Sequence, residues 1–358
     1  MPFIQNCFIK STFDCPDNIR EDVLDLMVNI SPTRTPFFSG WAKSVARNTL
    51  HEWQVDWHNR SSDPDNPVVE CARESSDFDF EELHCPCRVN NQIHLLRRTG
   101  DVSWLQRAMN TIGYDDEYAY QVNRQMKDLA LATEFALIHS VRGVTQQVAP
   151  QADGVCASPS GCRQMDGILS IAQWDETNFD CLDDLAQGTV LDYTGSPCQD
   201  LSPYIIDNLL QIMYHKGAEP NIIYVNSTLK RLISSFYFAG QWRTMPVEAQ
   251  KLINSIDYYE SDFGTLAIQI HLDLPTDALL ALDEQYMAVA FAYPAKVTPL
   301  AQVSNSDKFA MEHALTLEAR AMAAIGLILG LCTDDVLWCH PCDTNRNPVV
   351  APQSPLPR

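Results

Sequence analysis

The sequence predicts an α+β chain in which a mixed core is accompanied by long segments that lie outside it. Three patterns support this fold class: two extended runs joined by a long polar stretch, one unusually long helical stretch, and a later alternation of short helices and strands. The chain has 358 residues, of which 46% are hydrophobic, so it can bury a sizeable core. A chain of this length is expected to form roughly two domains.

The first segment, residues 1–44, is predicted to be an extended arm with one short helix. Asp17 is a suitable N-cap, and apolar residues follow it at helical spacing. Pro32 and Pro36 then prevent a regular helix. Because the segment has no core of its own, we expect it to lie on another surface.

A protruding hairpin is predicted after the arm. Residues 45–57 alternate between two faces, and Trp53 and Trp57 share one of them. A polar stretch follows at 59–80, and the chain returns as a second extended run at 83–96. Long insertions of this kind are often functional, and this one needs a neighbouring surface to lie on.

The strongest helix pattern in the chain spans residues 114–142. Acidic residues at 115–117 favour the positive end of the helix dipole, and Arg142 and Gly143 are expected to end the helix. At 1.5 Å per residue such a helix is roughly 40 Å long. This length suits a strut rather than an ordinary globular helix.

The second half of the chain predicts a mixed α/β unit. Helices are expected at 203–216, closed by Gly217, and at 227–238, with a short strand at 221–225 between them. Further strands are expected at 255–260, 265–271, 278–282 and 287–291. The stretch 308–320 alternates enough for a strand, although a helix is the alternative there.

Composition and charge exclude several classes of function. The net charge is −21, from 46 acidic and 25 basic residues, and no Lys/Arg cluster offers a surface for phosphates. The apolar stretch 321–331 is far shorter than the ~20 residues that a membrane span needs. Residues 1–10 lack the pattern of a signal peptide. We therefore expect no specific DNA binding, no membrane association and synthesis in the cytoplasm.

The twelve cysteines leave several interpretations open. Cys85, Cys87, Cys339 and Cys342 have spacings that could supply zinc ligands, and Cys339 with Cys342 could instead form a redox dithiol. Free or buried thiols are the default for a cytosolic chain, and a disulfide between tail and hairpin is the favoured alternative. Disulfides could also form after the protein leaves a reducing cell.

No catalytic or cofactor-binding residue is predicted. The chain has neither a glycine-rich phosphate loop nor a G-x-S-x-G elbow. His51-Glu52 begins a zinc-protease pattern, but Val55 stands where the second histidine would be needed. We therefore expect a packed strand at this place.

Five motifs carry a family resemblance. They are NISPTRTPF at 29–37, NTLHEWQ at 48–54, DEYAYQ at 116–121, DYYESDFG at 257–264 and the stretch 312–318. In this order they resemble the SU-ten-like branch of the major capsid proteins of tailed double-stranded DNA bacteriophages, which have the Hong Kong 97-type capsid fold. The resemblance covers roughly residues 25–331.

The resemblance implies a domain map. It consists of an N-terminal arm at 1–44, an extended β-hairpin loop at 45–100, a peripheral domain with a long spine helix at 101–170 and 284–331, an axial α/β domain at 171–283, and a proline-rich C-terminal tail at 332–358.

The resemblance also implies a function and partners. A protein of this family is expected to self-assemble into hexamers and pentamers of an icosahedral head that encloses DNA, first in the host cytoplasm and then in the virion. Separate scaffolding, portal and cement proteins are the expected partners, and no cofactor is expected. An encapsulin-like compartment and a cytosolic cysteine- or zinc-dependent enzyme are the alternatives.

The chain departs from the family pattern in one respect. No lysine lies between Lys43 and Lys127, so the extended loop cannot supply a lysine for covalent cross-linking of the shell. The shell then needs other stabilisation, from interwoven arms, the tail, disulfides or a separate cement protein. The residues expected to make contacts between subunits are Phe37, Phe38, Trp53, Trp57, Trp338, Pro348, Pro352 and Pro355.

Overall fold

The chain divides into two compact units, each described by itself. The computed structural model describes residues 34–58, 85–109, 111, 113–142, 163–182, 184–195, 198–235, 257–302 and 304–333. Unit 1 comprises the ranges 1–51, 90–167 and 289–318. Unit 2 comprises the ranges 52–89, 168–288 and 319–358.

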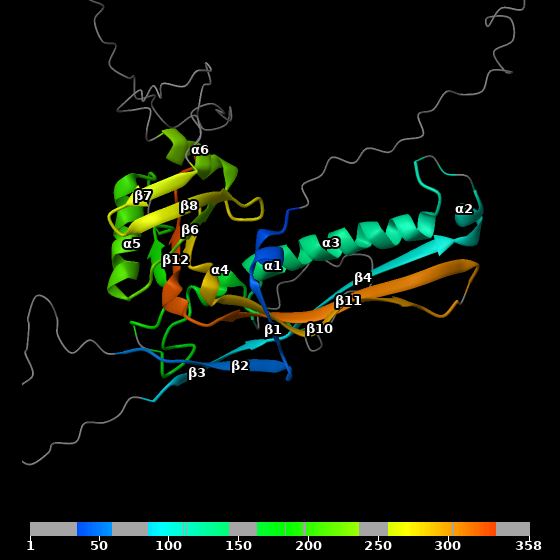
Figure 1. Ribbon diagram of the computed structural model, residues 1–358, viewed down its shortest axis with the longest axis horizontal. Helices are drawn as coiled ribbons and strands as arrows, with labels where there is room; N and C mark the ends of the chain where they lie inside the picture. Colours follow the sequence, from blue (N-terminus) through cyan, green and yellow to red (C-terminus); the bar gives the residue numbers. More distant parts are fainter. Residues whose placement is uncertain are drawn as a thin grey trace, which may run out of the picture. The chain divides into compact units, whose positions relative to one another are not determined.

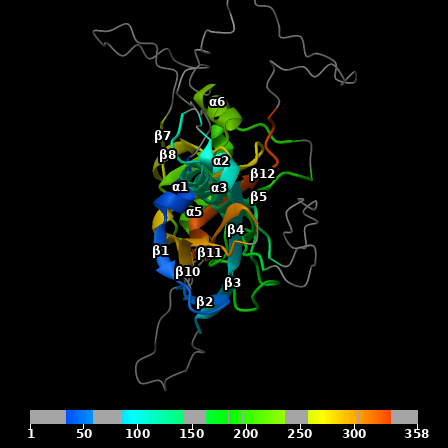
Figure 2. The same cartoon turned by 90° about the vertical axis from the view of Figure 1, so that its right-hand side faces the viewer.

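Unit 1 is built on a four-stranded sheet in the order β1-β10-β11-β4. Its strands are β1 (Ala42–Val45), β4 (His94–Ser103), β10 (Met287–Pro299) and β11 (Ser306–Ala319). Its helices are α1 (Pro36–Gly40), α2 (Trp104–Ala108) and α3 (Glu117–His139). The long α3 lies along β4, which pairs antiparallel with β11 from Ser103 opposite Ser306 to His94 opposite Leu315 (Figures 1 and 2).

The ends of α3 follow from its side chains. The carboxylate of Asp116 accepts the N–H of Tyr118 at 3.0 Å and caps the first turn. At the other end the helix stops at His139, three residues before the expected end, and the N–H of Arg142 donates to Asp166 Oδ1 at 2.7 Å. The carboxylate of Asp166, which is distant in sequence, therefore accepts a backbone N–H just after the end of the helix. Gly143, which was expected to end the helix, lies outside the described residues.

The core of unit 1 is an apolar layer between α3 and the sheet. Leu129, Phe309 and Met311 form its buried centre. A Cβ at Gly100 would lie 2.3 Å from a ring atom of Phe309, so the missing side chain on β4 makes room for this ring. The burial of each such side chain stabilises the packing of the long helix on the sheet by about 1.5–3 kcal/mol.

Unit 2 is built on a six-stranded sheet in the order β5-β12-β9-β6-β8-β7. Its strands are β5 (Thr189–Asp192), β6 (Ile222–Val225), β7 (Tyr258–Ser261), β8 (Gly264–Ile270), β9 (Leu279–Leu282) and β12 (Ile325–Leu329). Its helices are α4 (Ile168–Ile171), α5 (Pro203–His215), α6 (Ser227–Ser235) and the short 3-10 helices η2 (Glu284–Tyr286) and η3 (Met322–Ala324). The pairings β6–β8 and β12–β5 are parallel, as expected for a mixed α/β unit.

One face of α5 packs against this sheet. The helix buries Ile205, Ile206, Leu209, Leu210 and Met213 at helical spacing. Gly217 then adopts a φ of 84°, and the N–H of the next residue, Ala218, donates to the carbonyl of Met213 at 3.0 Å. This left-handed cap ends the helix at the glycine that the sequence indicates.

A separate two-stranded sheet joins β2 (Leu50–Val55) and β3 (Cys87–Gln92). These strands lie within the two extended runs that predict a hairpin. The connection between them, residues 59–84, lies outside the described residues. The strand prediction for the stem of the hairpin is therefore confirmed.

Several elements differ from the expected ranges. Helix α1 begins at Pro36, although we expected this proline to prevent a regular helix; proline is tolerated in the first turn, where its missing N–H is not needed. The stretch 308–320 is strand β11, so the helical alternative is wrong. Strand β12 lies between β5 and β9 in the six-stranded sheet. Long-range pairing gives the strand this place, and an apolar run does not specify such pairing by itself. No helix in the described part of the chain combines the length and apolar character of a bilayer span.

Candidate subunit-contact sites

A buried carboxylate on α3 holds the last part of the N-terminal arm. Glu134 is fully buried; its Oε1 accepts the N–H of Phe37 at 2.9 Å and its Oε2 accepts the N–H of Phe38 at 2.7 Å. Pro36 opens α1, so these are among the first free donors of the helix. Glu134 thus caps α1 from another element.

The two phenylalanines of this segment have different surroundings. Phe37 is fully buried and stacks on Trp41 with ring centroids 4.3 Å apart. It anchors the segment within its own chain, which differs from the expected contact with another subunit. Phe38 is half-buried, and its ring lies 6.1 Å from those of Phe291 and His313.

Lys43 completes the surroundings of Phe38. Its Nζ lies 5.0 Å from the centre of the Phe38 ring and donates to the carbonyl of the same residue. Burial lowers the pKa of Lys43, and the charge of Glu134 opposes this shift. The ammonium group of Lys43 therefore lies beside the accessible part of the Phe38 ring.

The stem of the hairpin is fastened to the end of β11. Glu318 Oε2 accepts from Ser44 Oγ at 2.7 Å and lies 3.1 Å from His51 Nε2. Trp53 lies two residues after His51 and on the same face of β2, and its Nε1 donates to the carbonyl of Ala319 at 2.8 Å. Trp53 also lies beside Trp174, with ring centroids 6.3 Å apart. His51 is therefore a structural residue, as the missing second histidine predicts.

Trp57 lies beyond the end of β2 and is half-buried. Trp53 is also half-buried, and both keep accessible surface on the hairpin. Aromatic side chains of this kind are enriched in protein interfaces. Both therefore stay candidates for contact with another subunit.

A buried amide fixes the base of β3. Asn91 is fully buried; its Nδ2 donates to the carbonyls of Asp166 and Leu317, each at 3.0 Å, and its Oδ1 accepts the N–H of Asp166 at 2.8 Å. Arg142 donates to the carbonyl of Asn90 at 3.3 Å. The sequence does not predict this network, because Asp166 and Leu317 lie 75 and 226 residues away from Asn91 along the chain.

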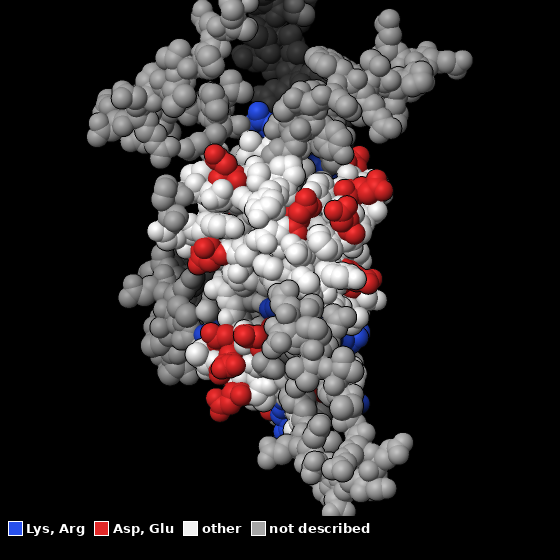
Figure 3. All heavy atoms as spheres, turned by 90° about the vertical axis from the view of Figure 1, so that its left-hand side faces the viewer, with Lys and Arg blue, Asp and Glu red and all other residues white. Residues whose placement is uncertain are grey.

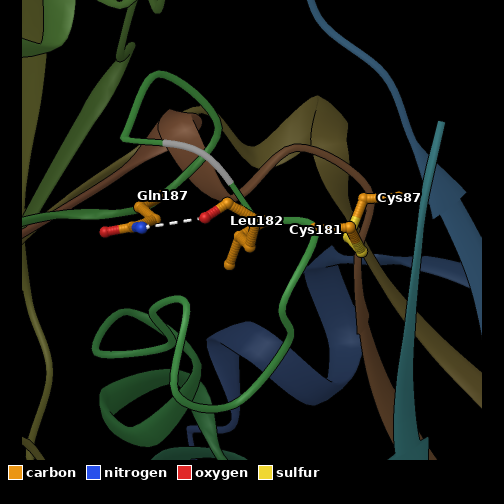
Figure 4. The surroundings of a disulfide bond; sticks show 4 residues. All are labelled: Cys87, Cys181, Leu182 and Gln187. Atoms are coloured by element: carbon orange, nitrogen blue, oxygen red, sulfur yellow. Dashed lines mark hydrogen bonds between the residues drawn. A yellow bond between two sulfur atoms is a disulfide. The ribbon is translucent and has the colours of Figure 1, made fainter. Parts of the chain in front are cut away.

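Disulfides take up four of the described cysteines. Cys87 is bonded to Cys181 (Figure 4), and Cys198 is bonded to Cys332. Cys87 is therefore not available as a zinc ligand, and the partner of Cys332 is not in the hairpin. Cys85 is free and exposed.

The described part of the chain contains neither the expected zinc site nor the expected contacts of the tail. Among the described residues no group of three or more His, Cys, Asp or Glu could hold a metal ion. The other candidates of the sequence analysis lie outside the described residues: Cys339, Cys342, Trp338, Pro348, Pro352 and Pro355. Their roles stay predictions.

An exposed apolar patch on α2 is a further candidate contact that sequence analysis missed. We call it the α2 patch; it consists of Trp104, Leu105 and Met109, which are 46%, 70% and 55% exposed. Ser103 Oγ caps this helix by accepting the N–H of Gln106 at 3.2 Å. The serine before Trp-Leu is the one signal that could have predicted it.

The charged neighbours of the α2 patch are paired within the chain. Arg107 Nη1 lies 2.9 Å from Asp307 Oδ2, and Arg107 Nε lies 3.3 Å from Asp116 Oδ1. These contacts raise the pKa of Arg107, with the hydrogen bond to Asp307 as the largest cause. Exposed apolar side chains bordered by neutralised charges are typical of a contact surface.

One face of the molecule has far more acidic than basic side chains. The face drawn in Figure 3 shows many Asp and Glu side chains, few Lys and Arg, and broad uncharged areas between them. Exposed acidic residues of unit 2 include Asp200, Glu219, Asp257, Glu260 and Asp262. Like charges of this kind oppose contact between copies, so contacts must rely on the uncharged areas.

Comparison with known proteins identifies the family. A family model described as SU10 major capsid protein matches residues 5–332. No curated protein matches the chain.

Solved capsid structures share the fold. The capsid of an empty GTA particle is 14% identical with a TM-score of 0.60, covering 90% of this chain and 100% of that one. The capsid of cyanophage A-1(L) is 12% identical with a TM-score of 0.63, covering 90% and 99%. The holo-SrpI encapsulin complex from Synechococcus elongatus PCC 7942 is 9% identical with a TM-score of 0.51, covering 91% and 97%.

At these identities the likeness shows the fold alone, which is the Hong Kong 97-type fold of phage capsids. The family match, in contrast, extends over nearly the whole chain. The chain therefore belongs to the SU10 major capsid protein family and is a major capsid protein of a tailed phage, a structural subunit of the virion shell.

Proposed function

We propose that this chain forms hexamers and pentamers that build an icosahedral head around double-stranded DNA. The observation that carries the proposal is the family match over residues 5–332. The DNA is enclosed without specific binding, because a chain of net charge −21 has no basic cluster to neutralise phosphates. Assembly takes place in the cytoplasm of the bacterial host, and the chain has no catalytic role.

The contacts between copies are individually modest and are summed by closed symmetry. We assign them to the accessible sides of Phe38, Trp53 and Trp57 and to the α2 patch. Phe38 belongs to the segment that Glu134 caps, and Trp53 is held by its bond to Ala319. Fixed side chains lose little freedom when they bind, which favours assembly.

The domains have the roles that the family resemblance implies. The arm at 1–44 and the extended loop at 45–100 lie on neighbouring copies. The peripheral domain at 101–170 and 284–331 contains the spine helix, and the axial domain at 171–283 surrounds the axis of the capsomer. Separate scaffolding, portal and cement proteins complete the head.

The tail at 332–358 docks on an adjacent subunit through Trp338, Pro348, Pro352 and Pro355. Deleting residues 333–358 should leave the fold of the subunit intact and lower the temperature at which shells fall apart. Differential scanning calorimetry of isolated subunits and of shells measures the two effects separately. Shells of the truncated chain that melt like full-length shells would contradict this role.

An encapsulin-like compartment is the second candidate, favoured by the fold that the chain shares with the encapsulin complex. Electron microscopy of particles containing this chain, combined with analysis of their nuclease-protected contents, separates the candidates. We expect closed shells with five- and six-fold capsomers around double-stranded DNA. Shells filled with protein and free of DNA would favour the compartment, and a chain that forms no shells would contradict both.

A further inference from the structure

Both described disulfides join parts of unit 2 that are far apart in the sequence. Cys87 begins β3, where the hairpin returns, and its Cα lies 5.3 Å from that of Cys181, 94 residues away. Cys332 follows β12, and its Cα lies 4.8 Å from that of Cys198, 134 residues away. One bond therefore fixes the return of the extended loop, and the other fixes the start of the tail.

Backbone hydrogen bonds place Cys198 and Cys332 together independently of the sulfur–sulfur bond. The N–H of Gln199 donates to the carbonyl of Gly330 at 3.0 Å, and the N–H of Cys332 donates to the carbonyl of Gln199 at 2.9 Å. Residues 199 and 331 form an isolated parallel bridge. The two thiols would therefore stay adjacent in the reduced chain.

The loop that contains Cys181 is ordered in the same way. The N–H of Leu182 donates to the carbonyl of Phe179 at 2.9 Å, and Gln187 Nε2 donates to the carbonyl of Leu182 at 3.1 Å (Figure 4). Leu182 itself is fully buried. These contacts hold the residue next to Cys181 in place whether or not the disulfide is formed.

Each pair joins an exposed cysteine to a less accessible one. Cys181 and Cys198 are exposed, whereas Cys87 is fully buried and Cys332 is half-buried. The exposed thiolate can attack a small oxidant, and the inner thiol then completes the bond. Once the bond is formed, the burial of Cys87 hinders attack by a reductant on its sulfur.

We propose that these two pairs are a redox lock: dithiols while the shell assembles in the reducing host cytoplasm, and disulfides after the particle is released. This inference rests on the proposed function, because it requires assembly inside the cell. The oxidant is a low-molecular-weight disulfide outside the cell. The exposed thiol displaces one half of that disulfide as a thiol, and the inner thiol then displaces the other half from the mixed disulfide. Two protein thiols and one small disulfide thus give one protein disulfide and two small thiols.

Locking strengthens the shell without any new contact between copies. Cross-links that close loops of this length restrict the unfolded chain, and longer loops give the larger effect. The extended loop cannot supply a lysine for cross-linking, so stabilisation within each subunit takes on more weight. The lock would act at the two places where outlying segments join unit 2.

Thiol alkylation before and after release tests the timing. Infected cells are treated with a membrane-permeant alkylating agent before lysis, released particles are treated likewise, and peptides containing the four cysteines are analysed by mass spectrometry. We expect alkylated thiols in shells from the cells and disulfides in released particles. Disulfides already present inside the cells, or free thiols in released particles, would overturn the proposal.

Variants test the stabilising effect. Wild-type shells should gain on the order of 10 °C in disassembly temperature when oxidised. Cys181→Ser and Cys198→Ser should each lose part of this gain and match the wild type when reduced, whereas the control Cys85→Ser, at a free exposed thiol, should keep all of it. Equal gains in all variants would refute the lock. A wild type that forms no shells at all, as judged by electron microscopy, would instead refute the proposed function.

Discussion

At the scale of single residues, Glu134 shows how one buried side chain can order a segment of the chain. It accepts two backbone N–H groups of α1 while fully buried. A charged group is stable in such a place only because its oxygens are hydrogen-bonded. The contact joins residues 97 positions apart, and no local sequence pattern indicates it.

Glu134→Gln should lower the free energy of unfolding of unit 1 by about 2–3 kcal/mol. The amide keeps one acceptor oxygen but turns an NH₂ group toward the second N–H donor of α1. Chemical denaturation of the isolated subunit measures the loss. Glu260→Gln, at an exposed position of β7, is the matched control and should change the stability by less than about 0.5 kcal/mol. Equal stability of the two variants would contradict the capping role.

Two histidines, the buried His313 and the half-buried His94, make unit 1 sensitive to acid. Burial, and secondarily the charge of His94, lowers the pKa of His313 from 6.5 to about 4, and burial lowers the pKa of His94 to about 4. His313 Nε2 lies 2.8 Å from Thr133 Oγ1 on α3. Protonation would therefore place charge between the spine helix and the sheet.

The direction of the pH effect follows from linkage. Between pH 6.5 and about 4 the unfolded chain binds protons that the folded chain does not, so stability should fall as the pH falls through this window. For His313 the full loss is about 3 kcal/mol. The free energy of unfolding, measured at about pH 7 and about pH 4.5, should fall less between these pH values for His313→Gln than for the wild type. The exposed His58→Gln is the control, and a His313→Gln loss as large as the wild-type loss would refute the assignment.

At the scale of elements, local sequence patterns predict those helices and strands whose ranges depend on residues close together in the sequence. The spine helix was expected at 114–142 and is found at Glu117–His139, because its acidic start and apolar stripes are local signals. Helix α5 and the strands β7, β8 and β9 are confirmed for the same reason.

Features that depend on distant partners could not be predicted. The short β5 has a weak pattern of its own and gains its place from parallel pairing with β12. The cysteine pairs follow from the fold and not from spacing, since twelve cysteines allow many pairings. Of the candidate contacts, Trp53 and Trp57 could be named from alternation on a strand, whereas the α2 patch required the helix to be seen.

Helix α2 allows contact and folding to be separated. Leu105 is 70% exposed, so Leu105→Asp should change the stability of the isolated subunit by less than about 0.5 kcal/mol. The same change should slow shell assembly strongly, because it places a charge in the middle of the α2 patch. Light scattering follows assembly and calorimetry follows the fold. Leu272→Asp, at a 64% exposed position of unit 2, is the matched control. Assembly of Leu105→Asp at the control rate would show that the α2 patch makes no contact.

At the scale of the whole molecule, charge opposes assembly and apolar contacts favour it. Each copy has a net charge of −21, so neighbouring copies repel one another. Raising the salt from about 0.01 M to about 0.15 M shortens the Debye length from ~30 Å to ~8 Å. Assembly of isolated subunits should accelerate over this range while their circular dichroism stays unchanged. A rate that falls with salt would mean that attraction between opposite charges drives assembly.

The central claim is that the surface which the arm and hairpin leave accessible in a single subunit is buried against other copies of the same chain. Hydrogen exchange of the β2 and β3 amides, measured in isolated subunits and in intact shells, tests it most directly. We predict strong additional protection of both strands in shells, with little change in β6 and β9, which are buried within unit 2 in either state. Equal protection of β2 and β3 in a compact, stable monomer would contradict the account.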